Sequence, residues 1–115
     1  MENSKVFQMP VSKVYPLLVN KAIRKGRTQE EVDTIICWLT GYSKEELDIL
    51  LEKEVSYQEF FEHAKMNENA NKITGVVCKI RVETIEDPLM KKIRQLDKLI
   101  DELAKGKSME KILRK

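Results

Sequence analysis

The chain has 115 residues, of which 42% are hydrophobic and 35% are charged, and its net charge is +2. This length and composition predict one folded domain over residues 1–115, with residues 1–11 as an irregular or flexible start. No apolar run approaches the roughly 20 residues of a membrane-spanning helix, and the N-terminus lacks a basic start followed by an apolar run. We therefore expect a cytoplasmic protein without a membrane partner.

The first predicted helix begins near Pro16, in the stretch SKVYPLLVNKAIRKG. Proline is favoured in a first helical turn, and Gly26 after basic residues is typical of a helix end. The apolar residues expected to face the core at helical spacing are Val14, Leu17, Leu18, Ala22 and Ile23.

Three capping boxes predict the starts of three further helices. Each places a hydroxyl residue at the N-cap and a glutamate three residues later, so that both side chains accept hydrogen bonds from exposed backbone amides. The pairs are Thr28 with Glu31, Ser43 with Glu46, and Ser56 with Glu59. The side chains that these helices should bury are Val32, Ile35, Ile36, Leu39, Leu47, Leu50, Leu51, Tyr57, Phe60, Phe61 and Ala64.

The stretch IICWLTGYSKEEL joins the first two of these helices through Gly41, in the manner of a helix-turn-helix element. A recognition helix offers Arg, Lys, Asn or Gln to base edges and phosphates, because the DNA duplex is densely negative. The helix after the turn instead begins with Glu45, Glu46 and Asp48. We therefore do not expect this element to recognise DNA.

Residues 71–86 fit two different periodicities. The strand-like set is Val76, Cys78, Ile80 and Val82, and the helix-like set is Ile73, Val76, Val77 and Ile80. A single strand in a helical chain would leave its amides unpaired unless a second subunit supplied an edge. We therefore predict a helix over residues 71–86.

Asp87 and Pro88 predict the start of a long amphipathic helix, as its N-cap and first residue. The apolar residues that follow at steps of four and three are Leu89, Ile93, Leu96, Ile100 and Leu103. Gly106 ends this helix, and Ser108 begins a short final helical turn. The apolar seam is too short to favour a stand-alone coiled coil, so we expect it to pack on the chain's own core, with an intermolecular helix pair as the alternative.

The stretches VYPLLVNKAIRKGRTQEEVDTIICWLTGY and ITGVVCKIRVETIEDPLMKKIRQLDKLIDELAKGKSMEKILRK resemble the bacterial domain-of-unknown-function family 2200 (DUF2200). The resemblance covers nearly the whole chain, and CWLTGY and EDPLM are its most distinctive parts. It implies an all-α fold, a small orthogonal helical bundle of about five to seven helices, and so supports a helix over residues 71–86. It implies no activity and no catalytic or binding residues.

The charges are unevenly distributed along the chain. Residues 1–27 carry a net charge of +5, residues 28–62 carry −8, residues 63–88 carry zero, and residues 89–115 carry +5. We favour packing of the basic ends beside the acidic centre within one molecule. The alternatives are a basic face for an anionic partner and head-to-tail contact between subunits.

A candidate surface for an anionic partner lies in the C-terminal region. Its residues are Lys91, Lys92, Arg94, Lys105, Lys107, Lys111 and Arg114. A basic tail can follow a phosphate backbone, which makes a nucleic-acid-associated protein the second functional hypothesis. Because few aromatic residues are interleaved there, a solvated terminus is the favoured interpretation.

Catalytic and metal-binding motifs are missing from the sequence. Cys37, His63 and Cys78 lack metal-ligand spacing, and we expect both cysteines to be buried, with a disulfide between them left open. A Cys–His nucleophile would need His63 beside one cysteine, which makes a small enzyme the third hypothesis. We predict no catalytic residue, no cofactor and no metal ion.

Trp38 and Tyr42 are the candidate partner-binding residues, because Trp and Tyr dominate interface hot spots. We favour core packing for Trp38, whereas Tyr42 should be more open because it lies in a turn. The favoured hypothesis is therefore a helical binding or protein-interaction module whose partner is another protein or a second copy, in preference to nucleic acid.

Overall fold

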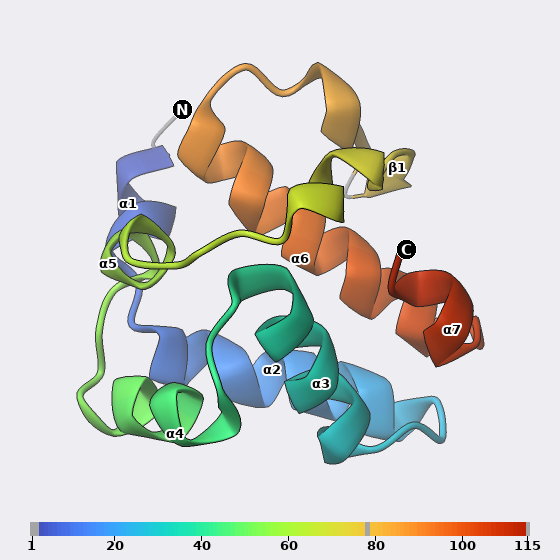
Figure 1. Cartoon of the computed structure of the whole chain (residues 1–115), viewed down its shortest axis with the longest axis horizontal. Coiled ribbons are helices and arrows are strands. Elements are labelled where there is room, and N and C mark those ends of the chain that lie inside the picture. Colours follow the sequence, from blue (N-terminus) through green and yellow to red (C-terminus); the bar gives the residue numbers. More distant parts are fainter. Residues whose placement is uncertain (1–2, 78, 115) are drawn as a thin grey trace.

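Helix α6 (Pro88–Ala104) is the central element of the structure (Figure 1). The structure is a computed structural model that describes residues 3–77 and 79–114. Asp87 caps the helix by accepting hydrogen bonds from the amides of Leu89 and Met90, over 2.9 and 3.0 Å. Pro88 is its first residue, where the missing N–H costs no hydrogen bond. The long amphipathic helix predicted near the C-terminus is confirmed.

Six further α-helices surround α6 in the described part of the chain: α1 (Asn3–Gln8), α2 (Val11–Arg24), α3 (Gln29–Thr40), α4 (Lys44–Glu52), α5 (Tyr57–Glu62) and α7 (Met109–Ile112). All of them except α4 are in substantial contact with α6. In Figure 1, α6 runs diagonally across the molecule while α5 is seen end-on, so the helices cross and do not run parallel. The predicted helical fold of five to seven helices is confirmed.

The predicted capping boxes explain where three of the helices begin. At Thr28 and Ser43, the hydroxyl accepts from the amide three residues on, and the glutamate there accepts from the cap's own amide. At Ser56 the hydroxyl half of the box forms, with Oγ 3.1 Å from the Glu59 amide nitrogen. The starts of α3, α4 and α5 therefore follow from local sequence.

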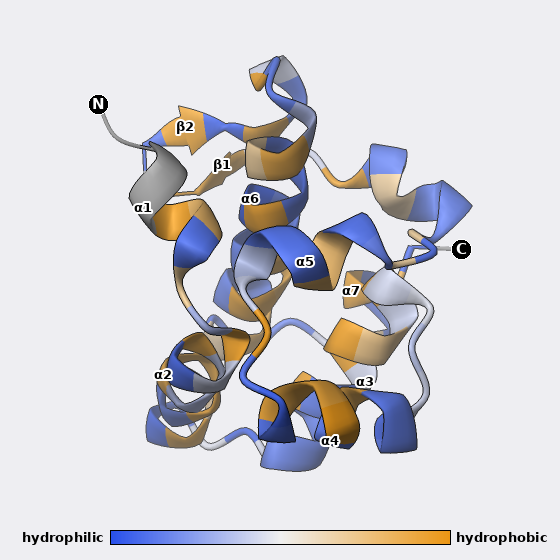
Figure 2. Cartoon of the chain, turned by 90° about the vertical axis from the view of Figure 1, so that its left-hand side faces the viewer, coloured by the Kyte–Doolittle hydropathy of each residue, from blue (hydrophilic) through white to orange (hydrophobic). Residues whose placement is uncertain are grey.

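The core lies where the apolar faces of the helices meet around α6. Its largest fully buried side chains are Ile35, Leu39, Leu47, Phe60, Phe61, Ile73, Ile93, Leu96, Leu99, Ile100, Leu103 and Ile112. Figure 2 shows hydrophobic and hydrophilic residues alternating along the helices, as expected when each helix buries one face.

The N-terminal region differs from the prediction. Residues 3–8, which we expected to be irregular, form α1, and α2 begins at Val11, so that Pro16 lies inside the helix. The Val11 amide donates to the Val55 carbonyl over 2.8 Å, and the Tyr57 amide donates to the Met9 carbonyl over 2.9 Å. This pairing with the α4–α5 connection anchors the chain ahead of Pro16, and a long-range contact therefore sets the start of α2.

The buried face of α2 also differs from the prediction. Leu17 and Ile23, which we expected to face the core, are 63% and 53% exposed. Val11, Val19 and Ala22 are buried in their place. Starting the helix earlier allows Val11 to join the buried face. Leu17 lies on the side of the helix almost opposite to that face.

The prediction of a helix over residues 71–86 is wrong. Strand β1 (Val76–Val77) pairs antiparallel with β2 (Ile80–Arg81), between the 3-10 helices η1 (Glu68–Lys72) and η2 (Val82–Thr84). The chain folds back on itself, so each strand supplies the partner that a lone strand would lack. Val77 of β1 and Val82 of η2 are buried, and β1 and η2 both pack on α6. Cys78 lies outside the described residues.

Candidate binding groove

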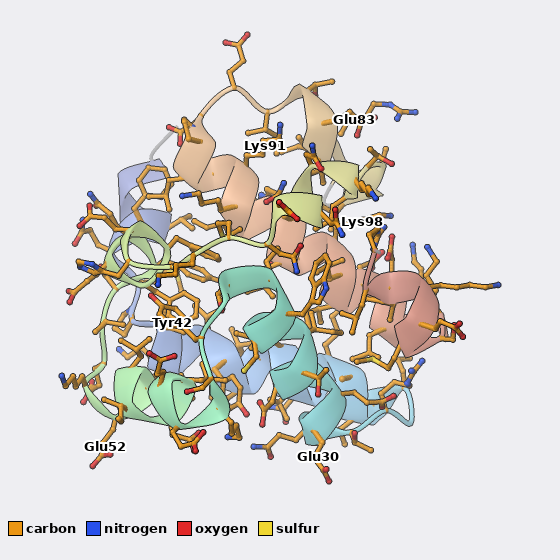
Figure 3. The ribbon with its side chains drawn as sticks, in the orientation of Figure 1. Glu30, Tyr42, Glu52, Glu83, Lys91 and Lys98 are labelled. Carbon is orange, nitrogen blue, oxygen red and sulfur yellow. The ribbon has the colours of Figure 1, made fainter. Side chains whose placement is uncertain are left out.

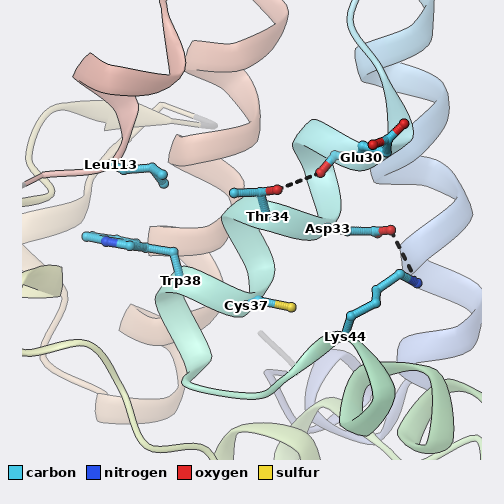
Figure 4. A pocket seen from close by; sticks show the side chains of 7 residues that line it. All are labelled: Glu30, Asp33, Thr34, Cys37, Trp38, Lys44 and Leu113. Atoms are coloured by element: carbon cyan, nitrogen blue, oxygen red, sulfur yellow. Dashed lines mark hydrogen bonds and ion pairs between the residues drawn. The ribbon is translucent and has the colours of Figure 1, made fainter.

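An open groove of about 620 Å³ lies along the outer side of α3 (Figure 4). Its lining residues are Glu30, Asp33, Thr34, Cys37 and Trp38 of α3, Lys44 at the start of α4, and Leu113 after α7. Spacings of three, four, seven and eight residues bring the five α3 side chains onto one face of the helix. The volume lies within the range of protein ligand sites.

The turn between α3 and α4 brings Lys44 opposite Asp33. Gly41 has a left-handed φ of 77°, and its amide donates to the Cys37 carbonyl over 2.9 Å. A Cβ at Gly41 would lie 2.5 Å from the Lys65 carbonyl oxygen, so a larger residue would displace the backbone. With the chain reversed here, Lys44 Nζ lies 3.3 Å from Asp33 Oδ2.

Asp33 is the buried centre of a polar network in the wall of the groove. It is 6% exposed, and it accepts a hydrogen bond from the Tyr15 hydroxyl of α2 in addition to its ion pair with Lys44. Lys44 also contacts Asp48 at 2.5 Å, and Gln29 Nε2 donates to the Tyr15 hydroxyl over 2.9 Å. The network therefore ties α2, α3 and α4 together on one side of the groove.

This network determines which groups carry protons. Burial and the hydrogen bond to Asp33 raise the pKa of Tyr15 to about 12. The hydrogen bond to Asp48 raises the pKa of Lys44, and burial raises the pKa of the Cys37 thiol. Tyr15, Lys44 and Cys37 therefore all remain protonated at neutral pH.

The two aromatic residues predicted to bind a partner lie in different surroundings. Trp38 is half-buried and lines the groove next to Leu113, at the end away from the Asp33–Lys44 pair (Figure 4). Tyr42 instead packs on α5, where its hydroxyl donates to the Phe60 carbonyl over 2.5 Å and the two ring centroids are 5.1 Å apart. Trp38 therefore remains the candidate for partner binding, and Tyr42 has a role in packing.

Most of the predicted basic surface is paired with acids of α6. The ion pairs are Arg94–Asp97 (3.0 Å), Lys105–Asp101 (3.1 Å), Lys107–Glu102 (3.5 Å) and Arg114–Glu102 (2.7 Å). Lys91 and Lys92 near the start of α6, and Lys111 on α7, make no ion pair with another described residue. The structure therefore does not bring the seven residues together as one unpaired basic surface.

The Cys–His arrangement does not occur at the groove. His63 caps the C-terminus of α5 and is exposed, outside the lining of the groove, and Cys37 is a free thiol.

Within residues 3–77 and 79–114, no three His, Cys, Asp or Glu side chains are grouped to hold a metal ion. In the same part of the chain, no helix combines the length and apolar character needed to cross a bilayer.

Five lining residues of the groove were not among the candidate site residues predicted from the sequence: Glu30, Asp33, Thr34, Lys44 and Leu113. The positions of Lys44 and Leu113 depend on how α4 and α7 pack against α3, which no local spacing reveals. One signal was available for Asp33. It shares a helix face with Ile36 and Thr40, both buried, and an acid on such a face needs buried partners.

Comparison with known proteins identifies relatives but no activity. A family described as "Uncharacterized protein conserved in bacteria (DUF2200)" matches residues 5–114. The structure titled "Crystal structure of uncharacterized protein SP1917" is 42% identical, with a TM-score of 0.90, and the match covers 95% of this chain and 90% of that one. No curated protein matches the chain significantly.

Proposed function

We propose that this chain, which belongs to the DUF2200 family, is a binding protein whose groove along α3 takes up a basic and apolar segment of a partner protein. One observation carries the proposal. The same groove combines an apolar end, formed by Trp38 and Leu113, with the carboxylate of Glu30, which makes no ion pair with another described residue. A segment that places an aliphatic side chain at the first and a Lys or Arg at the second would complement both.

The apolar end supplies the anchoring contact. Trp38 is half-buried, so its ring is held by the protein while one side remains available to a partner. Tryptophan in such a position is the residue most enriched among interface hot spots. A partner's aliphatic side chain placed between Trp38 and Leu113 would be removed from water on both sides.

The charge of the groove selects for a basic partner. The charged side chains that line the groove are Glu30, Asp33 and Lys44, and Lys44 also pairs with Asp48, so three carboxylates face one cation there. Glu30 points outward at the start of α3 and makes no ion pair with another described residue (Figure 3). The field at the groove therefore attracts cations, which raises the association rate and disfavours phosphates.

The other hypotheses have less support. A nucleic-acid surface would need free cations, and four of the seven candidate cations are paired within the protein. An enzyme would need an activated group, and burial keeps the thiol of Cys37 protonated. We further propose a cytoplasmic location and a single functional domain over residues 1–115.

Trp38 is the one tryptophan of the chain, so its fluorescence reports directly on the groove. We would titrate the protein with two short peptides of matched length, one of Leu and Lys and one of Leu and Glu. The Leu/Lys peptide should change the Trp38 emission in a saturable manner at about 0.15 M salt, and more weakly as salt is raised. The Leu/Glu peptide should have no such effect.

Two variants with the same charge change test the location of binding. Glu30→Lys reverses a charge in the groove, and Glu52→Lys reverses one at the far end of α4 (Figure 3). Glu30→Lys should weaken binding of the Leu/Lys peptide at least tenfold, whereas Glu52→Lys should change it little. Equal effects of the two variants, or equal binding of the two peptides, would refute the proposal.

A further inference from the structure

The exposed face of α2 carries the chemistry that the groove requires in a partner. Leu17, on this face, is 63% exposed, the most exposed large hydrophobic side chain of the described residues. The cations of the same helix and its C-cap are Lys13, Lys21, Arg24 and Lys25, and no acidic residue occurs between positions 3 and 29. We call this surface the α2 basic face, and we propose that it docks into the α3 groove of a second copy of the chain.

The α2 basic face is a continuous surface. Lys13, Leu17, Asn20 and Arg24 follow one another at spacings of four, three and four residues, so they form one stripe along the helix. Beside the stripe lies a hollow of about 340 Å³, which Lys21 and Lys25 also line. An aliphatic side chain is therefore flanked by cations, the arrangement that the groove's apolar end and the Glu30 carboxylate would complement.

The cations of this face are available to a partner. Lys13, Arg24 and Lys25 make no ion pair with another described residue. Lys21 lies 3.4 Å from Asp101, and its side chain is still 45% exposed. The positive charge of α2 is therefore mostly uncompensated within the molecule, while the groove has uncompensated negative charge.

The two surfaces cannot meet within one molecule. Tyr15 reaches Asp33 from the side of α2 that faces α3, and Ala22, almost directly above Tyr15 on the helix, is buried. Leu17 is two residues after Tyr15 and therefore about 200° around the helix from it. Since the basic face points away from the groove of its own chain, only another copy can supply the contact.

The contact is head-to-tail, because each copy gives its α2 basic face and receives another in its groove. Such heterologous contacts produce rings when the rotation closes and open chains when it does not. A nucleic acid could satisfy the cations of α2, but this face has no exposed aromatic ring on which bases could stack. This inference rests on the proposed function, because it names the partner of the same groove.

Two variants that each disable one half of the contact test the inference. The first double variant, Leu17→Glu with Arg24→Glu, disables the α2 basic face. The second, Glu30→Lys with Thr34→Lys, disables the groove. All four side chains are exposed, and circular dichroism checks that both variants fold. The wild type should increase in mass with concentration, on the order of 0.1 mM, in analytical ultracentrifugation, and less so at high salt. Each variant alone should be monomeric.

The mixture of the two variants gives the decisive result. One variant retains an intact groove and the other an intact α2 basic face, so an equimolar mixture should form a heterodimer and nothing larger. Lys53→Glu, an exposed site on the C-cap of α4, is the matched charge control and should associate like the wild type. A mixture that stays monomeric while the wild type associates would show a different interface and overturn the inference.

Other outcomes separate this inference from the proposed function. A wild type that remains monomeric to about 1 mM, while the Leu/Lys peptide still binds the groove, would overturn self-association alone. Failure of both would overturn both proposals. Sedimentation of a monomeric wild type with phosphatidylglycerol vesicles, lost with the Leu17 and Arg24 substitutions, would assign the α2 basic face to anionic lipid instead.

Discussion

The two basic regions of the chain, residues 1–27 and 89–115, carry the same net charge of +5 but use it differently. In the C-terminal region, Arg94, Lys105, Lys107 and Arg114 are paired with acids of α6. On α2, most cations have no acid beside them. The net charge of a segment therefore does not predict the charge that a partner meets, because pairing within the fold decides it.

The difference has a local cause in each region. Helix α6 carries its own acids, and Asp101 and Lys105 are one turn apart, where side chains meet. Burial raises the pKa of Asp101, but the hydrogen bond from Lys105 and the charge of Lys21 together outweigh it. The pKa is therefore below its ordinary value, and this carboxylate stays ionised. Helix α2 contains no acid, and the first one after it is Glu30. The C-terminal cations are therefore mostly paired within the fold, and those of α2 remain mostly unpaired at the surface.

The largest effect should come from breaking the C-terminal pairing at Glu102. This residue is 6% exposed and receives both terminal nitrogens of Arg114, at 2.7 and 2.8 Å, as well as Lys107. Glu102→Ala leaves a half-buried Arg114 without its partner and should lower the free energy of unfolding by about 3 kcal/mol. Urea unfolding followed by circular dichroism measures this. Glu110→Ala, at an exposed site of α7, should change it by less than about 0.5 kcal/mol.

A smaller effect should distinguish two arginines of the N-terminal basic region. Arg27 pairs with Glu31 at 2.8 Å and donates to the carbonyls of Leu103 and Lys107, which holds the turn after α6. Arg27→Leu should lower the free energy of unfolding by about 2 kcal/mol, because two carbonyls and a carboxylate lose their donors. Arg24→Leu removes the same group from the α2 basic face and should change it by less than about 0.5 kcal/mol. Equal losses would mean that the α2 cations also stabilise the fold.

The parts of the fold that sequence predicted are those with local causes. The caps at Thr28, Ser43 and Ser56, and the pair Asp87–Pro88, each act within one helical turn, so helix starts could be predicted without knowing what they pack against. The hairpin could not be predicted in the same way. Val77 and Val82 are buried because they pack on α6, and the Val82 amide donates to the Gly75 carbonyl over 2.9 Å, contacts that depend on tertiary structure.

The groove was predictable only in part, for the same reason. Trp38 was named as a candidate on its residue type alone, although core packing was favoured for it. The proximity of Asp33 to Lys44 depends on the reversal at Gly41, and that of Leu113 on the packing of α7. The α2 basic face was missed because helical spacing placed Leu17 in the core. A long-range backbone pairing, between the Val11 amide and the Val55 carbonyl, sets where that helix begins.

The smallest predicted effect is a pH dependence that Glu31 confers. The hydrogen bond from Arg27 is the main reason that the pKa of Glu31 is held below its ordinary value of 4.5, with the Thr28 amide adding to it. Because this pKa is lower in the folded state, ionised Glu31 stabilises the fold above its ordinary pKa, and the contribution is lost as the pH falls through the folded value. Glu31→Gln should therefore cost less than about 1 kcal/mol at neutral pH, as expected for a partly exposed pair. Urea unfolding of the wild type and Glu31→Gln over a range of pH should give free energies of unfolding that converge in acid.

The neighbouring substitution Glu30→Gln is the control for this last effect, since it removes the same charge from a site without an ion pair to another described residue. Its free energy of unfolding should remain within about 0.5 kcal/mol of the wild type. If the Glu31→Gln difference instead persisted unchanged into acid, the loss would come from the capping hydrogen bonds and not from the charge. Arg27 would then stabilise the fold only through its hydrogen bonds to the carbonyls of Leu103 and Lys107. Arg27 and the α2 cations would then differ in their hydrogen bonds and not in their ion pairs.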